Sequence, residues 1–204
     1  MFVVFEGVDG AGKGTQIDKC CAYLDRHNIN HIRTREPGGT SGAEAIRNLL
    51  VSGEVDRFDG MSELLMMYAA RHLHVKNIIQ PALADGKWVI CDRFSGSSYV
   101  YQGVAGGVGL GTVKQLHETI LGPLTPDVEI ILDLPVSVSL ERITDRSHDE
   151  NRFESKGLLF MESVRNGFLQ YANEKPTSRI VIDARESVEC IHQQIIAELM
   201  DRAS

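Results

Sequence analysis

Short apolar runs alternate along the chain with longer segments whose apolar residues recur every three or four positions. The short runs have the length and content of strands, and the longer segments have the period of amphipathic helices. The strand-like runs are Phe2–Glu6, His31–Arg35, Trp88–Asp92, Val128–Leu134 and Ile180–Asp183. Alternating strands and helices predict an α/β fold, in which a five-stranded parallel sheet lies between two layers of helices. We expect residues 1–204 to form a single domain of this three-layer sandwich type.

Residues 61–86 predict a long helix that is apolar on more than one side, with Leu64, Tyr68 and Ile79 among its apolar positions. Such a helix is either buried or packed against another chain, so a homodimer is expected. Pro81 interrupts the pattern and predicts a kink or a break, because proline removes one hydrogen bond of the helix.

The first strand-like run leads directly into a glycine-rich loop, and a helical pattern follows. The pattern Gly-x-x-x-x-Gly-Lys in this context predicts a phosphate-binding loop of the P-loop NTPase type. Glycines let successive backbone N–H groups face one anion, and the helix start adds its partial positive charge. Lys13 is expected to reach the outer phosphates of a nucleoside triphosphate. The residues of the loop are Gly7, Val8, Asp9, Gly10, Ala11, Gly12, Lys13, Gly14 and Thr15.

The position after the lysine departs from the usual pattern. A serine or threonine hydroxyl normally helps to hold magnesium there, whereas this chain has Gly14 and places Thr15 one position later. The departure affects the expected metal ligation and leaves the expectation of phosphate binding intact. A glycine-rich turn without a ligand is the alternative, but loop, lysine and flanking elements all agree with a phosphate site.

A candidate functional group follows each of the first three strand-like runs. The glycine loop follows the first, residues 36–39 (Glu-Pro-Gly-Gly) follow the second, and Asp92 with Arg93 follows the third. The carboxyl ends of parallel strands lie at one edge of a sheet, where ligands bind. Asp92 has the position of a carboxylate that orders magnesium; the alternative is a carboxylate that only pairs with Arg93.

Several arginines accompany these groups. Arg35 ends the second strand-like run, and Arg47 lies on the helix that follows, which Thr40 or Ser41 is expected to cap. Guanidinium groups beside a phosphate loop suit a second phosphate, although solvated surface charges are the commoner role of arginine. Arg71 lies in an apolar stretch and therefore needs an anion or a hydrogen-bond acceptor.

A charged segment at about residues 146–156 follows a helix that carries Arg142. It contains Arg146 and Arg152 and has few apolar anchors. One interpretation is an ordinary solvated loop. The other is a lid that closes over the phosphates and brings guanidinium groups to the transferring phosphoryl group. The residues alone favour neither.

The bulk composition excludes some partners. The net charge is −7, from 21 basic and 28 acidic residues, so neither nucleic acid nor a membrane surface is an expected partner. The longest apolar stretch, Val128–Leu134, is too short to span a membrane, and no signal-peptide pattern precedes Phe2. The four cysteines lack metal-binding spacing and have apolar neighbours, which indicates reduced thiols and a cytoplasmic protein.

Taken together, these motifs resemble the thymidylate kinase family, which phosphorylates dTMP with ATP in dTTP synthesis. The resemblance covers nearly the whole chain, and the ordered set of motifs is more specific than the phosphate loop alone. The matching segments are 5–13, 34–40, 68–71, 92–94 and 101–103, together with the arginine-bearing segment at 146–156.

The resemblance implies a role for each matching position. ATP would bind to the loop residues 7–15 with Arg142, and Mg²⁺ would bind near Thr15 and Asp92. Catalysis would depend on five residues, which are Lys13, Arg93, Arg146, Arg152 and Asp9. In dTMP, Asp9 would meet the 3′-hydroxyl, Arg71 the thymine carbonyl, and Tyr101 would crowd the 2′ position. The full set implied for dTMP is Asp9, Arg35, Arg47, Met67, Arg71, Arg93, Ser97, Ser98, Tyr101 and Gln102.

Gly10 and Ala11 stand where one branch of the family has an arginine, which suits the bacterial-type branch, in which lid arginines supply the charge. Met67 stands where the family usually has a phenylalanine that stacks on thymine, so looser contact with the base is expected. Two alternatives stay open. One is a kinase for another nucleoside monophosphate, such as UMP or AMP. The other is a GTP-binding switch protein, although no Asn-Lys-x-Asp segment for guanine is present.

Overall fold

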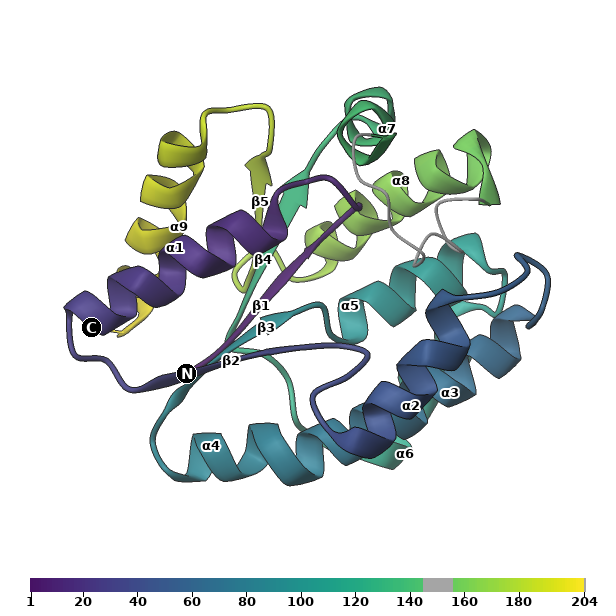
Figure 1. The fold of residues 1–204 in the computed structure, drawn as a ribbon, viewed down its shortest axis with the longest axis horizontal. Coiled ribbons are helices and arrows are strands. Elements are labelled where there is room, and N and C mark those ends of the chain that lie inside the picture. The colour runs from purple at the N-terminus through teal and green to yellow at the C-terminus, as the bar shows by residue number, and fades with distance from the viewer. Residues whose placement is uncertain (145–155, 204) are drawn as a thin grey trace.

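The computed structural model describes residues 1–144 and 156–203 and has one parallel sheet in this part of the chain. The five strands lie in the order β2-β3-β1-β4-β5, so the strand before the phosphate loop is central. Helices cover both faces of the sheet, as the alternating pattern predicts (Figure 1). The strands are β1 (Phe2–Gly7), β2 (His31–Arg35), β3 (Trp88–Asp92), β4 (Val128–Asp133) and β5 (Arg179–Asp183).

The register of the strands brings the candidate groups to one edge. Asp92 at the end of β3 is level with Phe5 of β1 and with Arg35 of β2. Gly7 is level with Leu132 of β4. All strands are parallel, so the groups after β1, β2 and β3 meet at the carboxyl edge.

The helices pack around the sheet in three groups. Figure 1 shows α1 and α9 on one side of the sheet, α5 and α8 on the other, and α2, α3 and α6 gathered together. A large apolar core fills the space between these layers. The helices are α1 (Lys13–Arg26), α2 (Ser41–Val51), α3 (Gly60–His74), η1 (Val75–Ile79), α4 (Gln80–Ala84), α5 (Ser95–Ser98), η2 (Tyr99–Ala105), α6 (Leu110–Leu121), α7 (Val136–Thr144), α8 (Leu158–Glu174) and α9 (Val188–Ala203).

The long helix predicted at 61–86 changes its geometry along its length. It runs as α3, passes through the π-helical segment η1, and ends as the short helix α4. The change in geometry begins before the proline. The Gln80 N–H donates to Val75 O, five residues back, and Pro81 lies within the first turn of α4. Leu64, Tyr68 and Ile79 are buried within this chain, whereas Leu73, Ile78 and Leu83 are partly buried and Met61 and Leu65 are exposed.

The glycine-rich segment after Tyr101 is largely helical, although glycines at 103, 106, 107, 109 and 111 predict a turning loop followed by a helix from Thr112. Residues up to Ala105 form the π-helical segment η2, and α6 begins at Leu110. In the described part of the chain, no helix has the length and apolar content that a membrane crossing requires.

Candidate active site

The phosphate loop joins β1 to α1. The backbone of Gly12, the residue before α1, is left-handed with φ 90°, and a Cβ at Gly7 would lie 2.5 Å from Leu132 O. Only glycine adopts these positions without strain or a clash, so the glycine pattern has a direct structural cause. Ser139 Oγ of α7 donates to Asp9 O at 2.7 Å and anchors the loop from the neighbouring helix.

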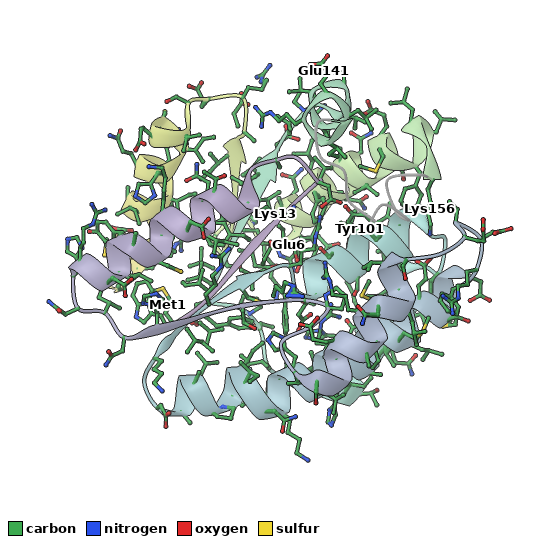
Figure 2. All side chains as sticks on the ribbon, viewed as in Figure 1. Met1, Glu6, Lys13, Tyr101, Glu141 and Lys156 are labelled. Atoms are coloured by element: carbon green, nitrogen blue, oxygen red, sulfur yellow. The ribbon has the colours of Figure 1, made fainter. Side chains whose placement is uncertain are left out.

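Lys13 lies in the first turn of α1 and folds back over the loop. Its Nζ donates to Gly7 O at 3.1 Å and to Val8 O at 3.0 Å, and lies 3.8 Å from Asp9 Oδ1. Burial lowers the pKa of Lys13, and Arg93 lowers it further, against the opposing effect of the carboxylates. Figure 2 shows Glu6, Lys13 and Tyr101 gathered in the middle of the molecule.

Arg93 converges with Lys13 on the same carboxylate. Its Nη2 donates to Asp9 Oδ1 at 2.6 Å, and its Nη1 donates to Ser97 Oγ at 3.0 Å. The Tyr101 ring lies beside its guanidinium at 5.3 Å, and the Tyr101 hydroxyl is 3.5 Å from Asp9 Oδ2. Burial would raise the pKa of Asp9, but Arg93 and Lys13 outweigh it and hold that pKa at about 2. Asp9 is therefore a fixed negative charge between two cations.

Glu6 lies beneath this cluster, and the sequence analysis did not assign it. It is fully buried, and its Oε1 accepts from the backbone N–H groups of Phe94 and Ser97 at 2.9 and 3.0 Å. Ser97 Oγ donates to its Oε2 at 2.6 Å. Burial raises the pKa of Glu6 to about 7, although Arg93 opposes the rise. A carboxylate inside an otherwise apolar strand next to the loop was the available signal.

The two residues expected near a metal lie at different levels of burial. Asp92 Oδ1 is buried and has no hydrogen-bond partner among the described residues, whereas Thr15 is exposed on α1. Arg93 pairs with Asp9, so the alternative in which Asp92 only pairs with Arg93 is not observed. No group of three or more His, Cys, Asp or Glu residues in the described ranges is arranged to hold a metal. The orphan carboxylate oxygen suits a cation that phosphate oxygens also hold.

The turn after β2 is fastened by the helix that follows it. Thr40 caps α2 by accepting a hydrogen bond from Ala43 N at 3.2 Å, as predicted. Glu44 of α2 accepts from Gly39 N and from Arg35 Nη2, each at 2.9 Å. Arg47 Nη1 donates to Pro37 O at 3.0 Å. Arg35 and Arg47 therefore border the same turn at the carboxyl edge, and Arg35 remains about half exposed.

Arg71 on α3 is buried, and its acceptors come from other elements. Its Nε donates to Glu36 Oε2 at 2.6 Å, and its Nη2 donates to Phe94 O at 2.9 Å and Ser98 Oγ at 3.0 Å. Burial lowers the pKa of Arg71, but Glu36 reverses the effect and the net shift is upward. This arrangement meets the expectation that a charge in an apolar stretch needs acceptors.

On α3, Met67 lies about one helical turn before Arg71, and Glu63 lies about two turns before it. Met67 is half-buried on α3, and Glu63, four residues earlier, is buried. Glu63 accepts from Gln102 Nε2 at 3.1 Å and from Lys156 Nζ at 2.9 Å. Gln102 Oε1 is buried without a hydrogen-bond partner in the part of the chain that is described. Glu63 therefore joins Gln102 to Lys156, and the sequence analysis assigned a role to neither Glu63 nor Lys156.

Arg142 connects α7 with the phosphate loop. Its Nη1 donates to Gly10 O at 3.2 Å, and its Nη2 donates to Ala184 O at 3.4 Å. It therefore lies next to the loop, where the resemblance expects the ATP side. Arg146 and Arg152 lie outside the described residues.

The fold and the site first define a class. A five-stranded parallel sheet with a phosphate loop after its central strand, and an arginine-rich group beside it, is a P-loop protein of the nucleotide-kinase type. The family model "Thymidylate kinase" matches residues 5–195. The chain belongs to the thymidylate kinase family.

Individual relatives agree with this assignment. The chain is 44% identical to a thymidylate kinase of Magnetococcus marinus over 98% of this chain and 96% of the relative. It is equally similar, over the same shares, to a thymidylate kinase of Caulobacter vibrioides. A crystal structure of thymidylate kinase from Ehrlichia chaffeensis superposes with a TM-score of 0.78 at 34% identity and 98% coverage of both chains. The resemblance predicted from the motifs is confirmed.

Proposed function

We propose that this protein phosphorylates dTMP to dTDP by direct, in-line transfer of the γ-phosphoryl group of ATP. The observation that carries this proposal is the convergence of Lys13 and Arg93 on Asp9 Oδ1, at 3.8 and 2.6 Å. Lys13 belongs to the phosphate loop and Arg93 to the acceptor side, so the two phosphate-binding groups adjoin at this carboxylate.

The chemistry requires positioning more than proton transfer. The attacking oxygen belongs to a phosphate that is already an anion, so no strong general base is needed. The main barrier is the repulsion between two polyanions held in line. Lys13 and Arg93 offset that repulsion, and the loop amides hold the ATP phosphates. Arg146 and Arg152 would act from a lid at about residues 146–156.

Mg²⁺ is the proposed cofactor. Bound Mg²⁺ would offset the charge of the ATP phosphates. Asp92, whose Oδ1 is buried and unpaired among the described residues, is proposed to hold the ion together with phosphate oxygens and water. Thr15 is exposed on the first turn of α1 and is the loop hydroxyl proposed to assist, since Gly14 offers none.

The acceptor side is proposed to read phosphate, sugar and base separately. Arg35, Arg47 and Arg93 would bind the 5′-phosphate. Asp9 and Tyr101 would meet the sugar at its 3′ and 2′ positions. The base would lie by Met67 and Arg71, and Arg71 Nη1 is buried without a partner in the described part of the chain. Ser97, Ser98 and Gln102 complete the proposed set, and Arg142 belongs to the ATP side beside Gly10.

We also propose a cytoplasmic homodimer. About half of the apolar residues of 64–83 are buried within the chain, so the proposal rests on the smaller set that is exposed. Leu49 of α2 and Met61 and Leu65 of α3 are 43%, 42% and 52% exposed, and α2 packs against α3. An exposed apolar group of this kind suits an interface with a second copy.

The test is a coupled assay of ADP formation with ATP and a panel of nucleoside monophosphates. We expect turnover to require dTMP and to be much lower with AMP, UMP and dCMP. Preferred turnover of AMP or UMP would favour the alternative of another monophosphate kinase. Slow hydrolysis of GTP without any acceptor would favour the switch protein instead.

A further inference from the structure

Arg71 ends a chain of buried polar side chains that links α3 to β2. Glu36 directly follows β2, Thr34 lies within β2, and His74 follows Arg71 by three residues on α3. Arg71, His74 and Glu36 are each at most 4% exposed. A charged group this deeply buried persists only with well-placed partners, so the geometry of the chain matters.

Glu36 uses a separate carboxylate oxygen for each neighbour. Arg71 Nε donates to Oε2 at 2.6 Å, and His74 Nδ1 lies 3.0 Å from Oε1. The second ring nitrogen of His74, Nε2, lies 2.6 Å from Thr34 Oγ1. With the proton on Nδ1, His74 donates to Glu36 and accepts from the Thr34 hydroxyl, so every link is satisfied.

These hydrogen bonds leave one nitrogen of the Arg71 guanidinium, Nη1, for a ligand. Nε and Nη2 of Arg71 are fully engaged, and the rings of Tyr68 and Phe94 lie 4.6 and 5.2 Å from its Cζ. Nη1 is buried and has no hydrogen-bond partner among the described residues. A buried donor without a partner is costly, and a ligand with a hydrogen-bond acceptor would recover that cost.

We propose that Glu36 is the positioning residue for recognition of the acceptor base and is itself held by His74 and Thr34. This proposal rests on the proposed function, in which Arg71 meets the base. Glu36 fixes the guanidinium plane through Nε and so sets the direction of Nη1. Nη1 can only donate a hydrogen bond. It therefore binds a ring carbonyl and disfavours an amino group at the same position. The hydrogen-bonded series Thr34–His74–Glu36–Arg71 therefore determines the preference for thymine over a cytosine-type base.

The test compares two phosphoryl acceptors that differ in the base at C4 and in the protonation of the adjacent N3. dTMP has a carbonyl at C4 of the base, and 5-methyl-dCMP has an amino group there. Glu36→Gln retains shape but has one acceptor oxygen for two donors. We expect its KM for dTMP to rise roughly ten- to a hundredfold while kcat changes little. The ratio of kcat/KM for dTMP to that for 5-methyl-dCMP should fall about tenfold.

Two variants at His74 test its hydrogen bond to Glu36, one that keeps a donor and one that removes it. In His74→Asn the amide can still donate to Glu36, so the acceptor ratio should stay near that of the parent enzyme. In His74→Leu the donor is lost, and the ratio should fall. These two variants decide the question if Glu36→Gln does not fold: equal ratios in both overturn the proposal.

A buried pair elsewhere provides the matched control. Glu129 of β4 is 3% exposed, accepts from Arg179 Nε at 2.9 Å and from the Tyr171 hydroxyl, and belongs to no proposed substrate contact. Glu129→Gln should lower the melting temperature and leave the acceptor ratio unchanged. An unchanged ratio in folded Glu36→Gln overturns the proposal, as does an equal fall in Glu129→Gln. A parent enzyme without dTMP kinase activity would refute the proposed function instead.

Discussion

At the scale of single residues, Arg93 contacts the phosphate loop through Asp9 and is proposed to bind the phosphate of the acceptor. It pairs with Asp9 at 2.6 Å and is held by Ser97, and the field of Asp9 helps to raise its pKa well above the ordinary value although burial opposes this. Arg93→Ala should lower kcat by roughly 10³-fold or more, the range seen for a guanidinium that acts on a transferring phosphoryl group. Single-turnover kinetics would measure the loss.

A surface arginine gives the comparison for Arg93. Arg202 on α9 pairs with Glu198 within its own helix and with Thr177 O, away from the phosphate loop. Arg202→Ala should retain kcat within about twofold, since surface ion pairs contribute little. Near-normal turnover of a folded Arg93→Ala enzyme would contradict the role proposed for Arg93.

The buried Glu6 carboxyl is expected to make the free energy of unfolding depend on pH. Burial raises its pKa from 4.5 to about 7, so the folded state holds the proton more tightly than the unfolded state. The contribution of Glu6 to stability is therefore complete below pH 4.5 and is lost as the pH rises through 7. Glu6→Gln keeps an acceptor for the N–H groups of Phe94 and Ser97 and removes the titration.

Urea unfolding at pH 5 and pH 8 measures this effect. The parent protein should lose more unfolding free energy between these values than Glu6→Gln, by an amount on the order of 3 kcal/mol. Glu118→Gln, an exposed change on α6, should behave like the parent protein. Equal losses in the parent protein and Glu6→Gln would show that Glu6 titrates normally.

The residue types of the site could be predicted, but their partners could not. The chemistry of the phosphate loop predicts the role of Lys13, whereas the roles expected for Arg93 and Asp9 follow from the resemblance to thymidylate kinases. Glu6 lies in an apolar run, and its partners Phe94 and Ser97 are 88 and 91 positions away along the chain. Glu36 belongs to a predicted functional group but received no role of its own, and Glu63 was not assigned, because their contacts with Arg71, His74 and Lys156 form only in the folded chain.

At the scale of elements, the cap of α2 connects stability with the acceptor side. Thr40 Oγ1 accepts from Ala43 N at 3.2 Å, and Glu44 and Arg47 lie on the helix that it starts. Thr40→Ala should cost about 1 kcal/mol of unfolding free energy, the usual loss for an N-cap. Thr119→Ala is the control, because that hydroxyl bonds to Gln115 O within its helix. Equal losses in a denaturant titration would refute the capping role.

The strands could be predicted nearly to the residue, because the buried strands β1, β3 and β4 are continuous apolar runs, whereas the edge strand β2 is polar and only partly buried. β1 extends one position further, to Gly7, and β5 starts one position earlier, at Arg179. The segment η2 was harder, since its glycines resemble turn signals. Gly103 instead permits close packing: a Cβ there would lie 3.1 Å from both Leu110 and Val113. Such a contact is invisible in a single sequence.

At the scale of the whole molecule, the parallel sheet gathers the candidate functional groups at one edge, and the apolar surface proposed for the dimer lies on α2 and α3. The register places the groups after β1, β2 and β3 side by side. The exposed apolar residues of α2 and α3 are Leu49, Met61 and Leu65. Their exposure in a single copy is the physical basis of the homodimer proposed above.

Leu65 is 52% exposed and is the most exposed of the three, so Leu65→Lys is the test of this interface. A lysine there would place an unpaired charge in a dimer interface but cost little in a monomer. Light scattering at micromolar concentration should give a dimer mass for the parent protein and a monomer mass for Leu65→Lys. Val188→Lys, on α9 at 44% exposure, should remain dimeric. A monomeric parent protein would reject the dimer, and a dimeric Leu65→Lys would place the interface elsewhere on the surface.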